Sequence, residues 1–184
     1  MPSLLNIGAG PVPPPEQYHG WEIVTLDIDE SVQPDIVLDA RELTTLEPGQ
    51  YDAVYASHVL EHFAECDVER VLWGFYHILK PRGWAHIRVP DVKEVLEAVV
   101  ENKLDLDDTL YTAQVGAIRV CDVLWGWQAQ IKRSEQPHYS HRYGFSGSVL
   151  GRAIKRAHFE YVELGYGGFE ITAMAYKRRP GEAE

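Results

Sequence analysis

The stretch that decides the fold is Leu4-Leu5-Asn6-Ile7-Gly8-Ala9-Gly10-Pro11, followed by Ile23-Val24-Thr25-Leu26-Asp27. Each apolar run is typical of a buried strand, and the two glycines let the backbone turn sharply and approach a ligand closely. Asp27 follows Gly10 by 17 positions, near the spacing of about 20 residues at which such units place a ribose-binding carboxylate. The third glycine of a dinucleotide fingerprint is replaced by Pro13. The stretch therefore predicts a nucleoside-binding βαβ unit without identifying the cofactor.

Three later segments repeat this pattern, in which an apolar run ends in polar residues. They are Asp35–Leu38 before Asp39-Ala40-Arg41, Tyr51–Ala56 before Ser57-His58, and Trp84–Val89 before Pro90-Asp91. Ligands of open α/β sheets bind at the carboxyl ends of the strands, so these polar residues are expected to meet at one site. The proline cluster from Pro11 to Pro15 predicts a shortened or delayed first helix.

Apolar periodicity predicts the remaining elements. The expected helices bury Val68–Leu79, Val92–Val100 (with a capping box from Asp91 and Glu94) and Val149–Ala157 (capped by Ser146 or Ser148); the expected strands are Tyr161–Leu164 and Ile171–Tyr176, joined by Gly165–Gly168. The predicted fold is α/β and Rossmann-like: a doubly wound, mostly parallel sheet with an antiparallel C-terminal hairpin, in three α/β/α layers.

The motifs HVLEH at residues 58–62 and LKPRG at residues 79–83, with the glycine loop and Asp27, carry a family resemblance. The chain resembles the class I S-adenosylmethionine-dependent methyltransferases, especially the small stand-alone type. The resemblance covers residues 3–91 and resumes at 141–165, whereas residues 103–140 match poorly. One departure is Asn6, where the family often carries an acid.

This resemblance implies S-adenosylmethionine as cofactor and direct, in-line methyl transfer as the activity. Asp27 would accept hydrogen bonds from the ribose, and Asp39 would meet the adenine amine. The implied cofactor-binding residues are Ile7, Gly8, Ala9, Gly10, Asp27, Ile28, Asp39, Ala40, Arg41, Ser57 and His58.

The acceptor side is expected from a variable lid segment at about residues 103–145, and above all from a flap over 132–143. Between Lys132 and Arg156 there are six basic residues against Glu135 alone, which favours a small, anionic acceptor. Imidazole titrates near neutral pH, so histidines are the candidates for proton transfer. The expected catalytic residues are His58 and His141, and the expected substrate-binding residues are His62, His138, Arg142 and Tyr143.

Two other functions fit parts of the sequence. His58-Val59-Leu60-Glu61-His62 satisfies the HxxEH pattern of zinc peptidases, but it begins at the end of an expected strand and lacks the long helix that the pattern requires. A binding module that holds the cofactor without chemistry is the second alternative. The sequence therefore assigns no metal ligand.

Composition sets the broad class. The 184 residues are expected to form a single domain over 1–184, and the net charge of -11 argues against nucleic-acid binding. Two cysteines without zinc spacing, no leader and no membrane-length apolar run predict a cytoplasmic protein without a membrane partner. A monomer or a homodimer is expected, with a small-molecule acceptor as the partner.

Overall fold

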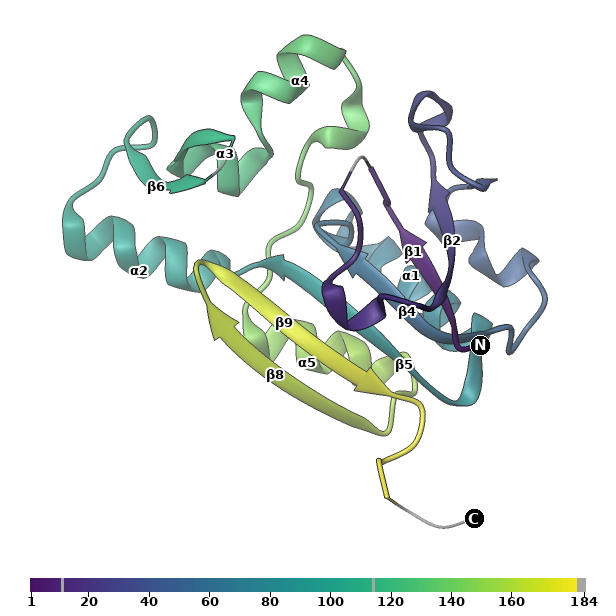
Figure 1. Cartoon of the computed structure of the whole chain (residues 1–184). Helices are drawn as coiled ribbons and strands as arrows, with labels where there is room; N and C mark the ends of the chain where they lie inside the picture. The colour runs from purple at the N-terminus through teal and green to yellow at the C-terminus, as the bar shows by residue number, and fades with distance from the viewer. Residues whose placement is uncertain (11, 114, 182–184) are drawn as a thin grey trace.

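A mixed sheet forms the centre of the computed structural model, which describes residues 1–10, 12–113 and 115–181; the prediction for Pro11 lies outside these residues. Its strand order is β3-β2-β1-β4-β5-β9-β8 (Figure 1). The strands β1 to β5 pair in parallel, whereas β9 is antiparallel to β5 and β8. This arrangement confirms the predicted Rossmann-like fold. The strands are β1 (Ser3–Ile7), β2 (Glu22–Asp27), β3 (Ile36–Val37), β4 (Tyr51–Ser57), β5 (Leu79–Pro90), β8 (Tyr161–Gly167) and β9 (Glu170–Tyr176).

One face of the sheet carries the main helical layer. It consists of α1 (Glu65–Ile78), α5 (Gly147–Arg156) and the 3-10 helix η3 (Ala40–Thr45). Phe75 of α1 and Ile154 of α5 are fully buried in one cluster with the apolar side chains of β1, β4, β5 and β9. Burial of each such side chain stabilises the fold by about 1.5–3 kcal/mol. The helical periodicity places these side chains on one face of each helix, and that face packs on the sheet.

The opposite face has a much thinner cover. The only helix among the described residues between β1 and β2 is η1 (Glu16–Tyr18), as the proline cluster predicted. Tyr18 and Trp21 pack there on Leu4 and Tyr55. The predicted third layer is therefore present over the middle of the sheet in reduced form, as aromatic side chains around a single turn.

The residues that follow α2 and precede α5 build a cap over the carboxyl ends of the parallel strands (Figure 1). We call residues 103–113 and 115–145 the cap. It has a small core of its own, in which Val120 and Val123 pack on Val95 of α2 (Val92–Asn102). The predicted lid segment is thus folded structure and not a lone flap; its elements are β6 (Thr109–Ala113), β7 (Gly116–Arg119), α3 (Val120–Trp125), α4 (Gln128–Ser134) and η5 (Pro137–Tyr139).

Local details differ from the sequence predictions at three helix or strand ends. The β8–β9 turn is Gly168-Phe169, because residues 165–167 stay paired with β9. Asp91 caps α2 as predicted, but Glu94 accepts a hydrogen bond from Phe169 N and does not complete a capping box. Ser146 occupies the N-cap of α5 without a side-chain cap, since its hydroxyl bonds Ser148. Along the described residues, no helix is long and apolar enough to cross a membrane.

Candidate functional site

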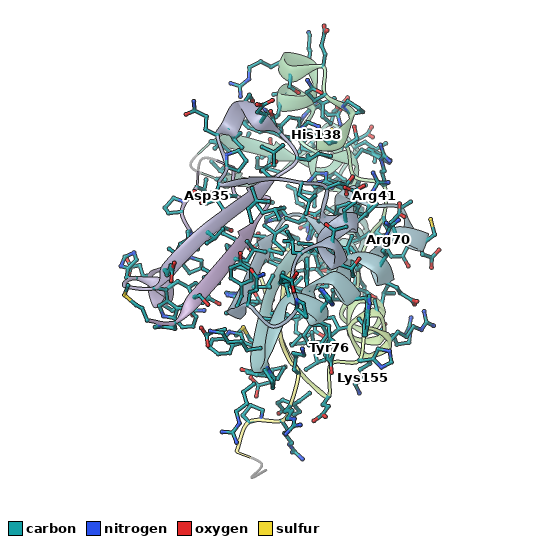
Figure 2. The ribbon with its side chains drawn as sticks, turned by 90° about the vertical axis from the view of Figure 1, so that its right-hand side faces the viewer. Asp35, Arg41, Arg70, Tyr76, His138 and Lys155 are labelled. Carbon is teal, nitrogen blue, oxygen red and sulfur yellow. The ribbon has the colours of Figure 1, made fainter. Side chains whose placement is uncertain are left out.

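A cleft of about 820 Å³ lies between the strand ends and the cap. Its lining joins Gly8 and Asp27 on the sheet to His138 and Arg142 in the cap. Figure 2 shows His138 above Arg41, and both residues belong to the lining of the cleft. The cleft therefore brings residues from both halves of the chain to one place.

The glycine loop is held open by its backbone conformation. Gly8 and Gly10 have φ values of 63° and 48°, in the left-handed region that side chains rarely adopt. A Cβ on Gly8 would lie 2.5 Å from Val59 Cγ2. Gly10 N donates to Asp27 Oδ2 at 3.3 Å, and Asp29 N donates to Asp27 Oδ1 at 2.9 Å. Asp27 thus orders both loops at the cleft edge.

A second part of the cleft wall, besides the glycine loop, is formed by η3 and the loop before it. Asp39 caps η3 by accepting from Arg41 N at 2.9 Å, and the guanidinium of Arg41 also bonds both oxygens of Asp39. These hydrogen bonds hold the pKa of Asp39 below its usual range. Its carboxylate is already occupied, so an adenine amine there would compete with Arg41. Ile28 and Leu38 add an apolar wall.

His58 sits between two carboxylates at the end of β4. Its Nδ1 lies 3.1 Å from Glu61 Oε1 and its Nε2 lies 2.6 Å from Glu170 Oε1. Burial lowers the pKa of His58, but the hydrogen bonds to Glu170 and Glu61 outweigh it and raise the pKa to about 10. Because both ring nitrogens donate, His58 is an imidazolium at neutral pH. In this arrangement neither ring nitrogen of His58 keeps a free lone pair that could accept a proton.

Glu170 is the residue that fixes this arrangement, and it also binds Arg88 of β5. It follows Phe169, whose φ of 64° is unusual for a side-chain-bearing residue. Phe169 stacks on Tyr111 of the cap with ring centroids 5.6 Å apart. The β8–β9 turn therefore aims Glu170 at His58.

His62 and His141 face each other across the joint between η4 (Leu60–His62) and the cap, with ring centroids 5.0 Å apart. Nδ1 of His62 lies 3.2 Å from Ser140 O, and Nδ1 of His141 lies 2.9 Å from Val123 O. A carbonyl oxygen only accepts, so each Nδ1 is assigned the proton and each Nε2 keeps a lone pair. Burial lowers the pKa of His141.

The remaining predicted residues divide into two groups. Ile7, Ala40 and His138 line the cleft, and His138 Nε2 is buried without a hydrogen-bond partner among the described residues. Ala9, Ser57 and Tyr143 do not belong to the cleft lining. The hydroxyl of Tyr143 donates instead to Glu65 at 3.1 Å, on the outer side of the joint.

Sequence reasoning missed several lining residues. The patterns at the strand ends do not include Val32, Phe63 or Glu170. For the cap residues, the sequence offered only the density of basic and aromatic side chains near 132–143. The missed cap residues include Tyr111, Ile118, Trp127, Gln130 and Arg133.

The HxxEH segment does not form a peptidase site. It runs from the end of β4 into the single turn η4, and not along one helix. The ring of His58 is bound to Glu61 and Glu170, while that of His62 turns to the cap. The two histidines of the motif therefore do not share a ligand.

Comparisons with known proteins agree with this geometry. A family model described as a methyltransferase domain matches residues 3–164, and no curated protein sequence matches. A methyltransferase from Archaeoglobus fulgidus, described as S-adenosylmethionine-dependent, is 15% identical, with 96% of this chain and 86% of that chain covered and a TM-score of 0.59. The PH0226 protein from Pyrococcus horikoshii is also 15% identical, with 96% of this chain and 82% of that chain covered and a TM-score of 0.60.

A third similar structure was solved with ligands. It is the 1,6-didemethyltoxoflavin-N1-methyltransferase from Burkholderia thailandensis, with bound 1,6-didemethyltoxoflavin and S-adenosylhomocysteine. The identity is 14%, the coverage is 96% of this chain and 71% of that chain, and the TM-score is 0.56. At such identities these structures show a shared fold.

Proposed function

We propose that this chain, which belongs to the family of methyltransferase domains, uses S-adenosylmethionine to methylate a small, anionic acceptor bound beneath the cap. The observation that supports this most is the continuous cleft that joins the glycine loop and Asp27 to the cap. One compartment of about 820 Å³ can hold a cofactor and an acceptor side by side.

The proposed cofactor position follows the cleft lining. Gly8 and Gly10 would meet the methionine part and the ribose, because no Cβ blocks the backbone there. Asp27 would accept from the ribose hydroxyls, and the base would lie against Ile28 and Leu38 near the amide of Ala40. The methyl group would then point past His58 toward the cap.

Alignment is the main catalytic contribution in this proposal. In-line transfer needs the acceptor atom, the methyl group and the sulfur held in one line, which orientation alone can achieve. His58 would act as a positioning residue, because its ring links the β4 end to Glu61 and Glu170 and has no free nitrogen.

The charges in the cleft support an anionic acceptor. Among the lining carboxylates, those of Asp39, Asp67, Asp122 and Glu170 are each paired with a cation, whereas that of Asp27 accepts hydrogen bonds from backbone amides. Arg133 and Arg142 also line the cleft, and neither makes an ion pair within residues 1–10, 12–113 and 115–181. Two unpaired guanidinium groups in one cleft attract a carboxylate or a phosphate group.

Binding of the cofactor is expected to stabilise the protein measurably. A ligand at about 100 times its Kd adds about 2.7 kcal/mol to the free energy of unfolding, which raises the Tm of a chain this long by about 5–10 °C. Differential scanning fluorimetry with S-adenosylmethionine and S-adenosylhomocysteine measures the shift, and NAD is the control. A shift with NAD and none with either sulfur compound would contradict the proposed cofactor site.

Replacement of Arg142 is expected to weaken acceptor use selectively. The probe is a panel of small aromatic carboxylic acids, phosphate esters and neutral alcohols, with formation of S-adenosylhomocysteine as the readout. We expect turnover with anionic members and a KM about 10- to 150-fold higher in Arg142→Ala, since a hydrogen bond to a charged group contributes about 1.5–3 kcal/mol. Arg152→Ala, at an exposed position of α5, is the matched control. Equal loss in both variants, or turnover of neutral members alone, would exclude this acceptor class.

A further inference from the structure

Glu61, His62 and His141 form a cluster to which the proposed methyl transfer assigns no role beyond the hydrogen bond between Glu61 and His58. One ligand-capable atom from each residue lies within 4.8 Å of the others. Glu61 and His62 come from η4, and His141 comes from the cap. The cluster therefore sits at the joint where the two halves of the cleft meet, with His62 and His141 in the cleft lining.

The carboxylate of Glu61 has one buried oxygen atom without a partner within the described part of the chain, which points to a ligand. Its side chain is 1% exposed, and Oε1 bonds His58 while Oε2 is buried with no hydrogen-bond partner in the described residues. An unpaired buried acceptor costs about 1–3 kcal/mol, and more when it is charged. A bound cation would satisfy that oxygen.

The two imidazoles supply the second, independent observation. Each Nδ1 is tied to a backbone carbonyl, of Ser140 or Val123, which fixes the ring and leaves Nε2 as a free ligand atom. Metal-binding histidines are held in this way by partners of their second nitrogen. The ring arrangement is thus already suited to coordination before an ion arrives.

We propose that Glu61, His62 and His141 bind a divalent transition-metal ion of the zinc type. Two imidazoles and one carboxylate are a donor set that such ions accept, and three protein ligands leave a further coordination position. Bonds of about 2.0–2.2 Å place tetrahedral ligands about 3.4 Å apart, so closure of the cluster by roughly 1 Å completes the site. This proposal replaces the expectation from sequence that the chain has no metal ligand.

The ion would have two consequences. It would fasten the cap to the end of β4, beside the bonds that Arg142 N and Tyr143 N donate to Glu61 O at 2.7 and 3.2 Å. Its open position would face the cleft, where an oxygen atom of an anionic acceptor can bind. Only this second consequence depends on the proposed function; binding of the ion itself does not.

Zinc binding can be measured without any activity assay. Protein without a polyhistidine tag is stripped with chelator, titrated with ZnCl₂ by calorimetry and analysed for metal after dialysis. We expect one zinc per chain, and binding at least about 10- to 100-fold weaker in His62→Ala and His141→Ala, because loss of a ligand costs no less than loss of its supporting partner. His19→Ala, at an exposed histidine, is the matched control.

Two further measurements keep the result decisive. Co²⁺ in place of Zn²⁺ gives visible bands for an imidazole–carboxylate site, whereas a thiolate charge-transfer band would reveal binding at Cys66 or Cys121. Circular dichroism checks that each variant folds, and Glu61→Gln serves as a third variant. Zinc that binds His62→Ala and His141→Ala as tightly as the wild type, or no binding to the wild type, overturns the proposal. Calorimetry of S-adenosylmethionine on metal-free protein tests the proposed function separately.

Discussion

Replacement of Asp27 by alanine is expected to weaken the binding of S-adenosylmethionine by about 10- to 150-fold. The loss corresponds to about 1.5–3 kcal/mol for a charge-assisted hydrogen bond to the ribose hydroxyls. Asp27 also accepts from Gly10 N and Asp29 N, so its removal loosens both loops that border the cofactor. Isothermal titration calorimetry of the wild type and the variant measures the ratio of Kd values.

Two companion variants separate the causes of that loss. Asp27→Asn keeps one side-chain oxygen for the backbone amides and removes the charge, so its affinity should fall between those of the wild type and Asp27→Ala. Asp35→Ala is the matched control: Asp35 bonds Thr25 N and Thr25 Oγ1 outside the cleft, and Figure 2 shows it well away from Arg41. Unchanged affinity in Asp27→Ala would remove this carboxylate from the cofactor site.

Local patterns predicted the sheet because its parallel strands are contiguous apolar runs. Leu5 and Ile7 in β1 and Val54 and Ala56 in β4 are buried, so hydrophobicity marks these strands without knowledge of their partners. The β8–β9 turn escaped prediction for the opposite reason. Phe169 adopts φ 64° although it is no glycine, and its backbone is held by Glu94 and Asp91. Long-range contacts override local preference there.

In the candidate site too, local patterns identified some residues, whereas long-range contacts place the others. Asp27 and His58 were found because each ends a strand, and strand ends meet in this type of fold. The partner of His58 is Glu170, 112 residues away, and it arrives only because β9 inserts beside β5. The protonation of His58 depends on that partner, so a residue that looks like a base in the sequence is an imidazolium in the fold. The pairing of His62 with His141 likewise depends on how the cap closes.

Acidification is expected to destabilise the protein through His86, which lies beneath η1 on the thinly covered face of the sheet. Its Nδ1 faces Tyr18 OH at 3.2 Å and Gln17 Nε2 at 3.3 Å, while Tyr55 and Arg88 lie nearby. With two donors directed at Nδ1, the proton is assigned to Nε2 and the ring is neutral. Burial, with a smaller contribution from Arg88, lowers the pKa of His86 to about 4.

The direction of the pH effect on stability follows from the pKa of His86 in the folded and in the unfolded state. The folded state binds the proton of His86 more weakly than the unfolded chain, whose histidine pKa is about 6.5. The stabilisation is therefore complete above pH ~6.5 and is lost as the pH falls toward 4, by about 3 kcal/mol in total. Urea denaturation between pH 7.5 and 4 measures this loss.

His86→Gln is the variant that isolates the effect, because glutamine fills similar space and cannot gain the charge. Its free energy of unfolding should be lower than that of the wild type at pH 7.5, and the difference should shrink as the pH falls, since only the wild type loses stability through this ring. Curves that stay parallel over the whole range would assign the acid sensitivity to other groups. Because η1 follows the glycine loop in the chain, protonation of His86 should also loosen the segment next to the cofactor, and the affinity for S-adenosylmethionine should fall over the same range in the wild type more than in His86→Gln.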